Sequence, residues 1–153
     1  MAPRDILTLV FALEGDLSLL RIPESRLPRR TSGLWMHTCL EVFLMAEGGP
    51  GYREFNFSPS GEWAVYDFHG YRDAAELEID LAPAIVVCRS GDRLELDAKI
   101  CHDFLPRGRP LRLGLAAVME DSAGGLSYWA LQHPPGKPDF HHTDAFALQL
   151  ELP

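Results

Sequence analysis

Hydrophobic and polar residues alternate with a period of two along several segments of this chain. The clearest is the segment 93–100, in which every second residue is apolar and the residues between them are charged. Segments 111–117 and 146–152 repeat the pattern. Successive side chains of a β-strand point to opposite faces, so this period indicates strands with one buried and one solvated face.

Shorter apolar segments, separated by turns rich in Gly, Pro, Asp and Ser, supply further strand candidates. They are 6–13, 16–22, 39–46, 52–58, 62–69, 77–81, 84–89 and 126–132. Only 72–76 and 102–105 are expected to form short helical turns, and no strand–helix alternation occurs. The pattern therefore predicts an all-β fold in a single domain over 1–153: a two-sheet antiparallel sandwich of jelly-roll type, immunoglobulin-like in outline.

Composition narrows the classes of partner. The 153 residues carry 14 Lys and Arg against 22 Asp and Glu, which gives a formal net charge of −8. The one basic run, 26–30, is interrupted by Leu and Pro and is expected to be a loop. A nucleic-acid-binding domain needs a stripe of Lys and Arg, so no nucleic-acid partner is expected.

The amino-terminal apolar run and the cysteines both indicate a cytoplasmic protein. Segment 6–13 is too short to cross a bilayer and no small-residue cleavage site follows it, so neither a membrane anchor nor a signal peptide is expected. Cys39, Cys88 and Cys101 form an odd set without CxxC spacing. They are interpreted as small apolar residues in a reducing compartment. The oligomeric state is left open.

Aromatic and polar residues gather in three stretches, 34–43, 52–72 and 128–142. These hold all three Trp and five of the six His residues. Large rings beside polar groups are typical of a pocket that stacks on a ligand and hydrogen-bonds its edges. Within segment 52–58, Tyr52, Glu54 and Asn56 share one face, which is either an ordinary solvated face or the floor of a groove. Glu41 is likewise either an outward-facing surface charge or a ligand acceptor.

Metal and haem sites find little support. His133, His141, His142 and Asp139 lie within ten residues of one another, but their spacing matches no metal motif, so no metal site is expected. A haem site would pair a Met with a His as axial ligands. The candidates are Met36 or Met45 with His37, His133 or His141, and haem stays open only as an alternative to a domain without a cofactor.

Catalytic arrangements are incomplete. No G-x-S-x-G nucleophile elbow is present, and no Gly-rich loop precedes a Lys and a helix. The residues Glu41, Glu54, Asp139 and His141 have the chemistry of a general acid or base, but one sequence does not give their separation. An enzyme acting on a sugar-like substrate is therefore an alternative, and no catalytic residue is assigned.

The three aromatic stretches together resemble the DOMON-like domains and the related family-nine carbohydrate-binding modules. The residues that carry the resemblance are Trp35 with 38–43, Tyr52 with 54–61 and 71–72, and 128–129 with 138–141 and 146–148. The resemblance implies a β-sandwich of jelly-roll type with a ligand site on one sheet and its loops. Relatives bind sugars or haem and are mostly non-catalytic modules.

Carried over residue by residue, the resemblance implies a specific site. Trp129 matches a late binding tryptophan, and Glu41, Asn56, Arg72 and His141 match motif positions near the pocket. Trp35 and Trp63 are aromatic candidates by proximity. The expected function is therefore non-catalytic binding of a small, sugar-like polar molecule inside the cell.

Overall fold

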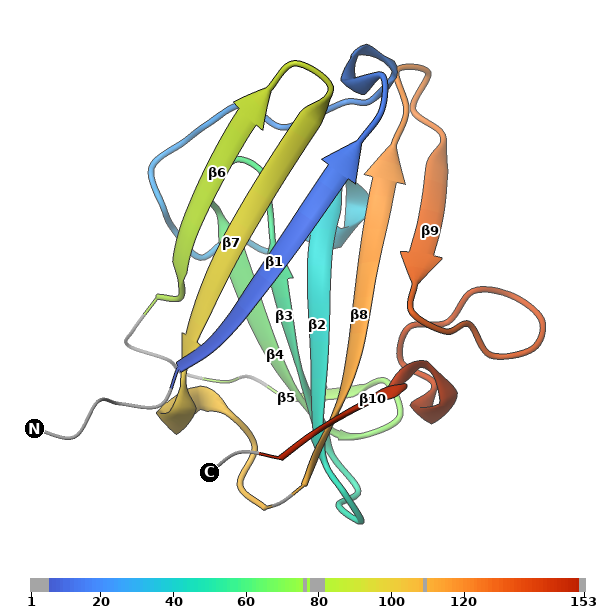
Figure 1. Ribbon diagram of the computed structural model, residues 1–153. Coiled ribbons are helices and arrows are strands. Elements are labelled where there is room, and N and C mark those ends of the chain that lie inside the picture. The colour runs from blue at the N-terminus through green and yellow to red at the C-terminus, as the bar shows by residue number, and fades with distance from the viewer. Residues whose placement is uncertain (1–5, 76, 78–81, 109, 152–153) are drawn as a thin grey trace, which may run out of the picture.

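The computed structural model describes residues 6–75, 77, 82–108 and 110–151, and strands dominate them (Figure 1). The strands are β1 (Ile6–Glu14), β2 (Cys39–Ala46), β3 (Tyr52–Phe57), β4 (Trp63–Gly70), β5 (Asp73–Ala75), β6 (Ala84–Ser90), β7 (Arg93–Cys101), β8 (Leu111–Glu120), β9 (Leu126–Ala130) and β10 (Leu148–Leu150). Four single 3₁₀ turns accompany them: η1 (Leu17–Leu19), η2 (Leu34–Met36), η3 (His102–Phe104) and η4 (Thr143–Ala145). None of these turns has the length or hydropathy needed to cross a bilayer.

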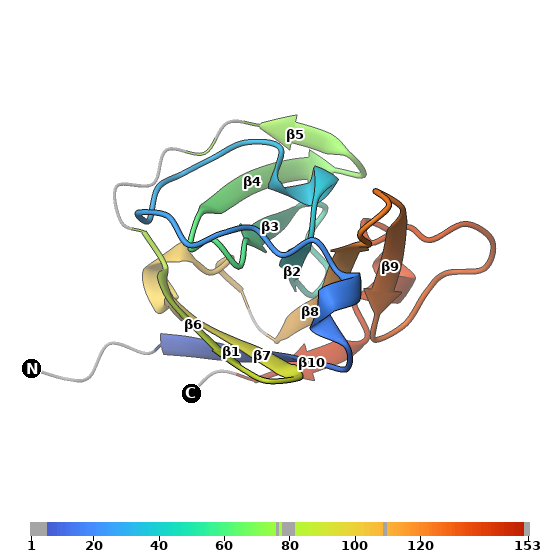
Figure 2. The same cartoon turned by 90° about the horizontal axis from the view of Figure 1, so that it is seen from above.

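The strands form two antiparallel sheets that face each other, which confirms the predicted sandwich (Figure 2). The smaller sheet has the order β1-β7-β6. The larger sheet has the order β10-β8-β2-β3-β4-β5. Strands β9 and β10 share one edge of β8: β10 pairs with its residues 111–113 and β9 with its residues 116–120. Strand β2 lies in the middle of the larger sheet, between β8 and β3.

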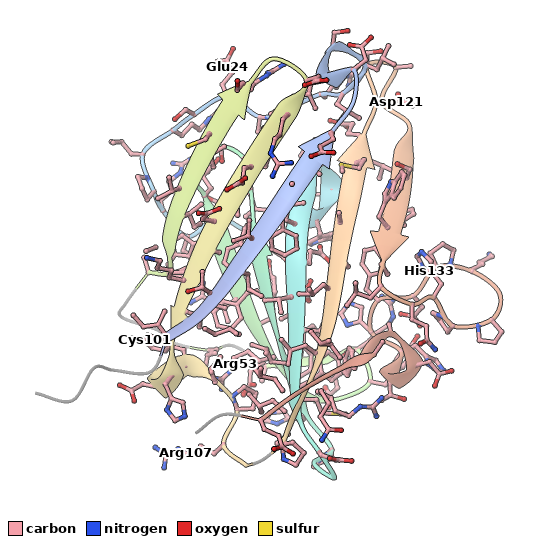
Figure 3. All side chains as sticks on the ribbon, viewed as in Figure 1. Glu24, Arg53, Cys101, Arg107, Asp121 and His133 are labelled. Carbon is pink, nitrogen blue, oxygen red and sulfur yellow. The ribbon has the colours of Figure 1, made fainter. Side chains whose placement is uncertain are left out.

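The main core fills the space between the two sheets, where side chains from both layers meet (Figure 3). The alternating apolar residues of β7 supply one side of it, as their period predicts. The residues of the larger sheet that face them are Leu40, Val42, Leu44, Phe55, Phe57, Trp63, Val65, Leu111 and Leu113. Burial of these side chains is the main stabilising contribution to the sandwich.

The opposite face of the larger sheet is also covered, which alternation alone does not predict. Phe43 of β2 and Tyr52 of β3 pack there against Phe146, which follows η4. The Phe146 ring lies on Gly114 of β8, where an added Cβ would come within 3.0 Å of the ring. Chain segments that follow β9 thus close over the outer face and bury the middle strands on both sides.

Several predicted elements differ from those observed. Segment 16–22 contains η1 instead of a strand, because the Asp16 carboxylate accepts a hydrogen bond from the Ser18 backbone N–H and caps the turn. The predicted helical turn at 72–76 is wrong, since β5 pairs there with β4. Segment 77–81 lies outside the described residues except for Leu77, which is not in a strand. The loop expected at 26–30 and the turn at 102–105 are confirmed.

Candidate functional site

A cavity of about 520 Å³ opens on the outer face of the larger sheet, away from the small sheet. Its volume lies within the range of small-molecule sites. The floor is made by alternate residues of five strands: Glu41, Glu54, Tyr66, Phe68, Val118 and Tyr128. Register explains the grouping, since Glu54 pairs with Tyr66 across β3 and β4, and Val118 pairs with Tyr128 across β8 and β9.

Three irregular segments build the walls of this cavity. Turn η2 contributes Trp35 and Met36. Gly33 begins η2 in the left-handed region at φ 78°, and an added Cβ would come within 2.7 Å of the Met36 side chain. Arg72 comes from the β4–β5 turn, and Phe140 and His141 come from the long segment between β9 and η4.

Two carboxyl groups are buried side by side on the cavity floor. Glu41 is 2% exposed and Glu54 is 5% exposed. Burial raises the pKa of Glu54 to about 7, while hydrogen bonding from Asn56 and the charge of Arg72 oppose the rise. Burial, and then the neighbouring Glu54 charge, raise the pKa of Glu41 well above its ordinary value. The floor therefore holds carboxyl groups that retain protons near neutral pH.

Asn56 connects to this pair from the side, on the same face of the sheet. It is fully buried and lies opposite Glu41 in the β2–β3 register. With its amide oriented to satisfy its neighbours, Asn56 Nδ2 donates to Glu54 Oε1 at 2.9 Å and to the Phe55 carbonyl at 3.3 Å. Both amide protons are used in this way, and Asn56 orients Glu54 instead of lining the cavity.

His141 is held neutral by its surroundings. Burial lowers its pKa to about 4, and the nearby Arg72 charge acts in the same direction. The Tyr52 hydroxyl lies 2.8 Å from His141 Nδ1 and accepts the Arg72 backbone N–H at 3.0 Å. Because that oxygen already accepts, its own proton is free to go to Nδ1. We therefore assign the proton of the imidazole to Nε2, which lies 4.0 Å from Glu54 Oε2.

An ionic clamp closes one side of the cavity. Arg72 Nη2 donates to Asp139 Oδ1 at 2.9 Å, and the Tyr71 hydroxyl donates to the other carboxylate oxygen. Asp139 Oδ1 also accepts the His141 backbone N–H at 3.0 Å. Burial opposes ionisation of Asp139, but the hydrogen bonds from Tyr71 and Arg72 outweigh it and lower its pKa. The clamp joins the β4–β5 turn to the loop that carries His141.

Removing the Tyr52 hydroxyl should loosen this corner. We expect Tyr52→Phe to lower the free energy of unfolding by about 1–2 kcal/mol, because the Arg72 N–H and His141 Nδ1 each lose a partner at a partly buried position. Urea denaturation measures the change. In nitrogen-15 NMR spectra, His141 should titrate near pH 4 and show the Nε2–H tautomer in the wild type, with a mixed tautomer in the variant. An unchanged tautomer in Tyr52→Phe would contradict the assignment.

The cavity brings together four of the seven residues predicted to bind ligand. Glu41, Arg72, His141 and Trp35 line it. The interpretation of Glu41 as an outward-facing surface charge is wrong, because β2 is central in the sheet and covered on both faces.

The other three predicted residues lie elsewhere. Asn56 is buried beside Glu41 on the same face and does not line the cavity. Trp63 points into the core between the sheets and is 5% exposed. Trp129 pairs with Ala117, so it takes the face opposite to that of Tyr128, and it is 62% exposed at the edge of the larger sheet. Neither of these two tryptophans lines the cavity.

Sequence reasoning missed other lining residues, and most were within its reach. Period two places Tyr66 and Phe68 on one face of segment 62–69, but nothing in the sequence indicates which face of that strand binds the ligand. Tyr128 is adjacent to Trp129, and only the pairing of β9 with β8 decides which of the two faces the cavity. Glu54 was placed on a face that could be the floor of a groove and was considered as a possible acid or base, but it was not assigned to the ligand site.

Within the residues that the structure describes, no group of three or more His, Cys, Asp or Glu side chains is placed to hold a metal ion. His133 lies in the loop beyond β9, away from the sheets (Figure 3), and packs on Phe140. His142 accepts the Asp144 backbone N–H at the start of η4.

The residues of the cavity also do not fit a haem group. Met36 and His141 both line it, but one ring nitrogen of His141 is held by Tyr52 and the other faces Glu54. An axial bond to iron would have to displace these contacts. It would also place the apolar macrocycle against two buried carboxyl groups, which is unfavourable.

The cysteines fit the interpretation as apolar residues in part. All three are free, with Cys39 buried, Cys101 half-buried and Cys88 exposed. Burial, with added repulsion from Glu41 and Glu54, raises the pKa of the Cys39 thiol well above its usual value. A thiol held in its protonated form is a poor nucleophile, so Cys39 serves as a buried apolar side chain.

Comparison with known proteins identifies a similar fold. No family model matches the chain, and no curated protein matches it. A crystal structure of a protein from Bacteroides uniformis, provisionally assigned as a carbohydrate-binding protein, superposes with a TM-score of 0.69 at 16% sequence identity. The match covers 96% of this chain and 73% of that one. At this identity the likeness shows the fold.

Proposed function

We propose that this chain is a binding domain whose outer cavity takes a small carbohydrate or a similar polyhydroxylated molecule. One observation carries the proposal: the cavity combines aromatic walls with buried polar groups that line its floor. Trp35 of the wall and Tyr128 of the floor are partly exposed, whereas Glu41 and Glu54 are buried. Sugars present apolar C–H faces and polar hydroxyl edges, so they need both kinds of surface.

The protonation states of the floor suit hydroxyl groups. A carboxyl group that retains its proton both donates and accepts hydrogen bonds, as a hydroxyl does. The Nε2–H of His141 and the guanidinium of Arg72 add donors at the wall. The provisional assignment of the Bacteroides uniformis protein as carbohydrate-binding adds support, as does the resemblance of the sequence to family-nine carbohydrate-binding modules.

The arrangement of the carboxyl groups favours binding over catalysis. In most glycoside hydrolases the two carboxyl groups flank the scissile bond, about 5–10 Å apart. Here Glu41 and Glu54 come from adjacent strands of one sheet and share the cavity floor. A sugar above them would meet both groups on the same side, which suits recognition of its hydroxyl edge.

Two tryptophans provide a matched test of the cavity. We expect Trp35→Ala to weaken binding of a sugar ligand by about tenfold or more, because the lost ring removes a stacking surface at the cavity wall. Trp129→Ala should leave affinity unchanged, since Trp129 lies outside the cavity although it is as exposed as Trp35. Isothermal titration calorimetry against mono- and disaccharides measures both.

If no mono- or oligosaccharide binds or shifts the melting temperature of the wild type, the chain is not a sugar-binding domain. If Trp129→Ala abolishes binding and Trp35→Ala does not, the ligand site lies on another surface.

A further inference from the structure

The geometry points to a ligand that carries a positively charged amine, as an amino sugar does. The inference rests on the proposed function and names the chemical class of the ligand. Its basis is an imbalance on the floor of the cavity: two buried carboxyl groups line it, and the charged groups of the surrounding protein do not neutralise them.

Glu41 is the clearest part of the imbalance. Its side chain is almost completely buried and lines the cavity. Among the described residues, none hydrogen-bonds its carboxyl group. The one amide nearby, that of Asn56, spends both protons on Glu54 and on the Phe55 carbonyl. The carboxyl group therefore opens to the cavity without a protein partner, and that partner is expected to come from the ligand.

The cationic side chains around the cavity are otherwise engaged. Arg72 forms an ion pair with Asp139 and stacks over the Tyr71 ring. Arg30 donates to the backbone carbonyls of Val65 and Leu77. His141 is neutral over the physiological range. Two carboxyl groups therefore face a cavity in which the guanidinium charge is already offset.

The aromatic rings of the cavity add a second attraction for a cation. Trp35 and Tyr66 line the cavity together with Phe68, Tyr128 and Phe140. The faces of such rings carry negative electrostatic potential and attract ammonium groups, most strongly where water is excluded. A neutral sugar would use the rings for stacking only. A ligand with an ammonium group would use the rings and also supply a positive charge to balance Glu41 and Glu54 in their ionised forms.

A cationic ligand and a neutral ligand differ in whether their binding releases a proton from the cavity floor. Glu54, with a pKa of about 7, holds a proton for most of the time at pH 6.5. A cation stabilises the ionised carboxylate and so drives that proton into solution on binding. A neutral ligand has no such effect. The other titratable or charged groups around the pair are Cys39, Tyr52, Tyr66, Arg72, Asp139 and His141. Their pKa values are shifted away from pH 6.5: those of Cys39, Tyr52, Tyr66 and Arg72 are raised, and those of Asp139 and His141 are lowered.

The experiment is titration calorimetry of the full chain at pH 6.5, in two buffers of different ionisation enthalpy. The probes are glucosamine, galactosamine and mannosamine, each compared with its parent sugar and its N-acetyl form. Sugar amines resemble an α-amino group, with a pKa of about 8, and are protonated at this pH. We expect the amine to bind at least about tenfold more tightly than both neutral counterparts. Net proton release should accompany its binding.

Two glutamate variants complete the test. Glu41→Gln should remove the preference for the amine, because the uncharged amide no longer neutralises it. Glu62→Gln changes a buried glutamate that lies outside the cavity and is bound by Arg29, Thr31 and Ser60, so it should keep the preference. Thermal denaturation of each variant confirms that it folds.

The outcomes separate the inference from the proposed function. If the parent and N-acetyl sugars bind as tightly as the amine, without proton release, the cationic ligand is wrong and the sugar-binding proposal stands. If no sugar binds but choline does, with loss of binding in Glu41→Gln, the cavity recognises a cation and the sugar proposal is wrong. If neither sugars nor choline bind, both are wrong.

Discussion

Replacing Glu54 with Gln should raise the free energy of unfolding by up to about 3 kcal/mol at pH 8 and change it little at pH 4. The wild-type carboxyl has a pKa of about 7 in the folded protein, against an ordinary value of 4.5. That difference corresponds to about 3 kcal/mol that ionised Glu54 costs the native state. Gln keeps an oxygen that can accept from Asn56 and carries no charge.

The sign of the pH dependence follows from the proton balance. Between about pH 4.5 and 7 the native state holds more protons on Glu54 than the unfolded state does. Wild-type stability should therefore fall as pH rises through this window and level off above it. Urea denaturation of both proteins across the window measures the difference. A stability difference between them that does not grow with pH would show that Glu54 titrates normally.

Glu62→Gln supplies a control with the opposite sign. Hydrogen bonds from Thr31, Arg29 and Ser60 outweigh burial and lower the pKa of Glu62. Its ionised form therefore stabilises the native state at pH values above its ordinary pKa, and that contribution is lost as pH falls through the lowered pKa. The same substitution should thus destabilise the protein at pH 8. At pH 8 Glu54→Gln should thus stabilise the protein and Glu62→Gln should destabilise it, which would distinguish a cavity carboxyl group from one held in a structural hydrogen-bond network.

Truncating Phe146 to Ala should cost about 3–5 kcal/mol of stability and also weaken ligand binding. The ring is fully buried and packs on Phe43 and Tyr52 with centroid distances of 5.9 and 5.4 Å. Its removal leaves a cavity that Gly114 beneath it cannot fill. Because Phe146 anchors the segment that carries His141, that wall of the ligand cavity should loosen as well.

Leu148 provides the matched control for this variant. It lies two residues further along the chain, in β10, but is 45% exposed. Leu148→Ala should therefore change the free energy of unfolding by less than about 1 kcal/mol. Denaturation curves and sugar titrations of both variants measure the two effects. Equal losses of stability would mean that the closing segment is not anchored through the Phe146 ring.

Stability and binding are expected to oppose each other at the cavity floor. Glu54→Gln gains stability at pH 8 by removing a buried charge, and it removes one of the groups proposed to hold the ligand amine. Natural proteins retain such destabilising groups where function requires them. A variant that is both more stable and weaker in binding would agree with the assignment of this cavity as the functional site.

The strand pattern was readable from the sequence because it depends on local geometry. Segment 93–100 alternates between apolar and charged residues, and β7 buries every second side chain against the larger sheet. Period two follows from the backbone of any strand, without reference to its neighbours. The bounds of β7 follow from this period to within a residue, and those of β2 and β3 follow equally closely from apolar segments bounded by turn residues.

The depth of a residue within the sheet was not readable in the same way. Glu41 lies in a strand that is buried on both faces, because β2 is central and the segments after β9 close over its outer side. The charge itself suggests an exposed position, since an unpaired buried carboxylate is unfavourable. Only the arrangement of distant segments shows that this residue lines a cavity.

The choice between neighbouring aromatic residues shows the same division. The sequence by itself determined that residues 128 and 129 alternate along a strand, because that depends on the backbone alone. The tertiary structure decided that Tyr128 faces the ligand cavity and Trp129 faces away, through the register of β9 on β8. A shift of one residue in that register would exchange them. Strands are thus determined locally, whereas the cavity depends on long-range pairing and on the loops that close over it.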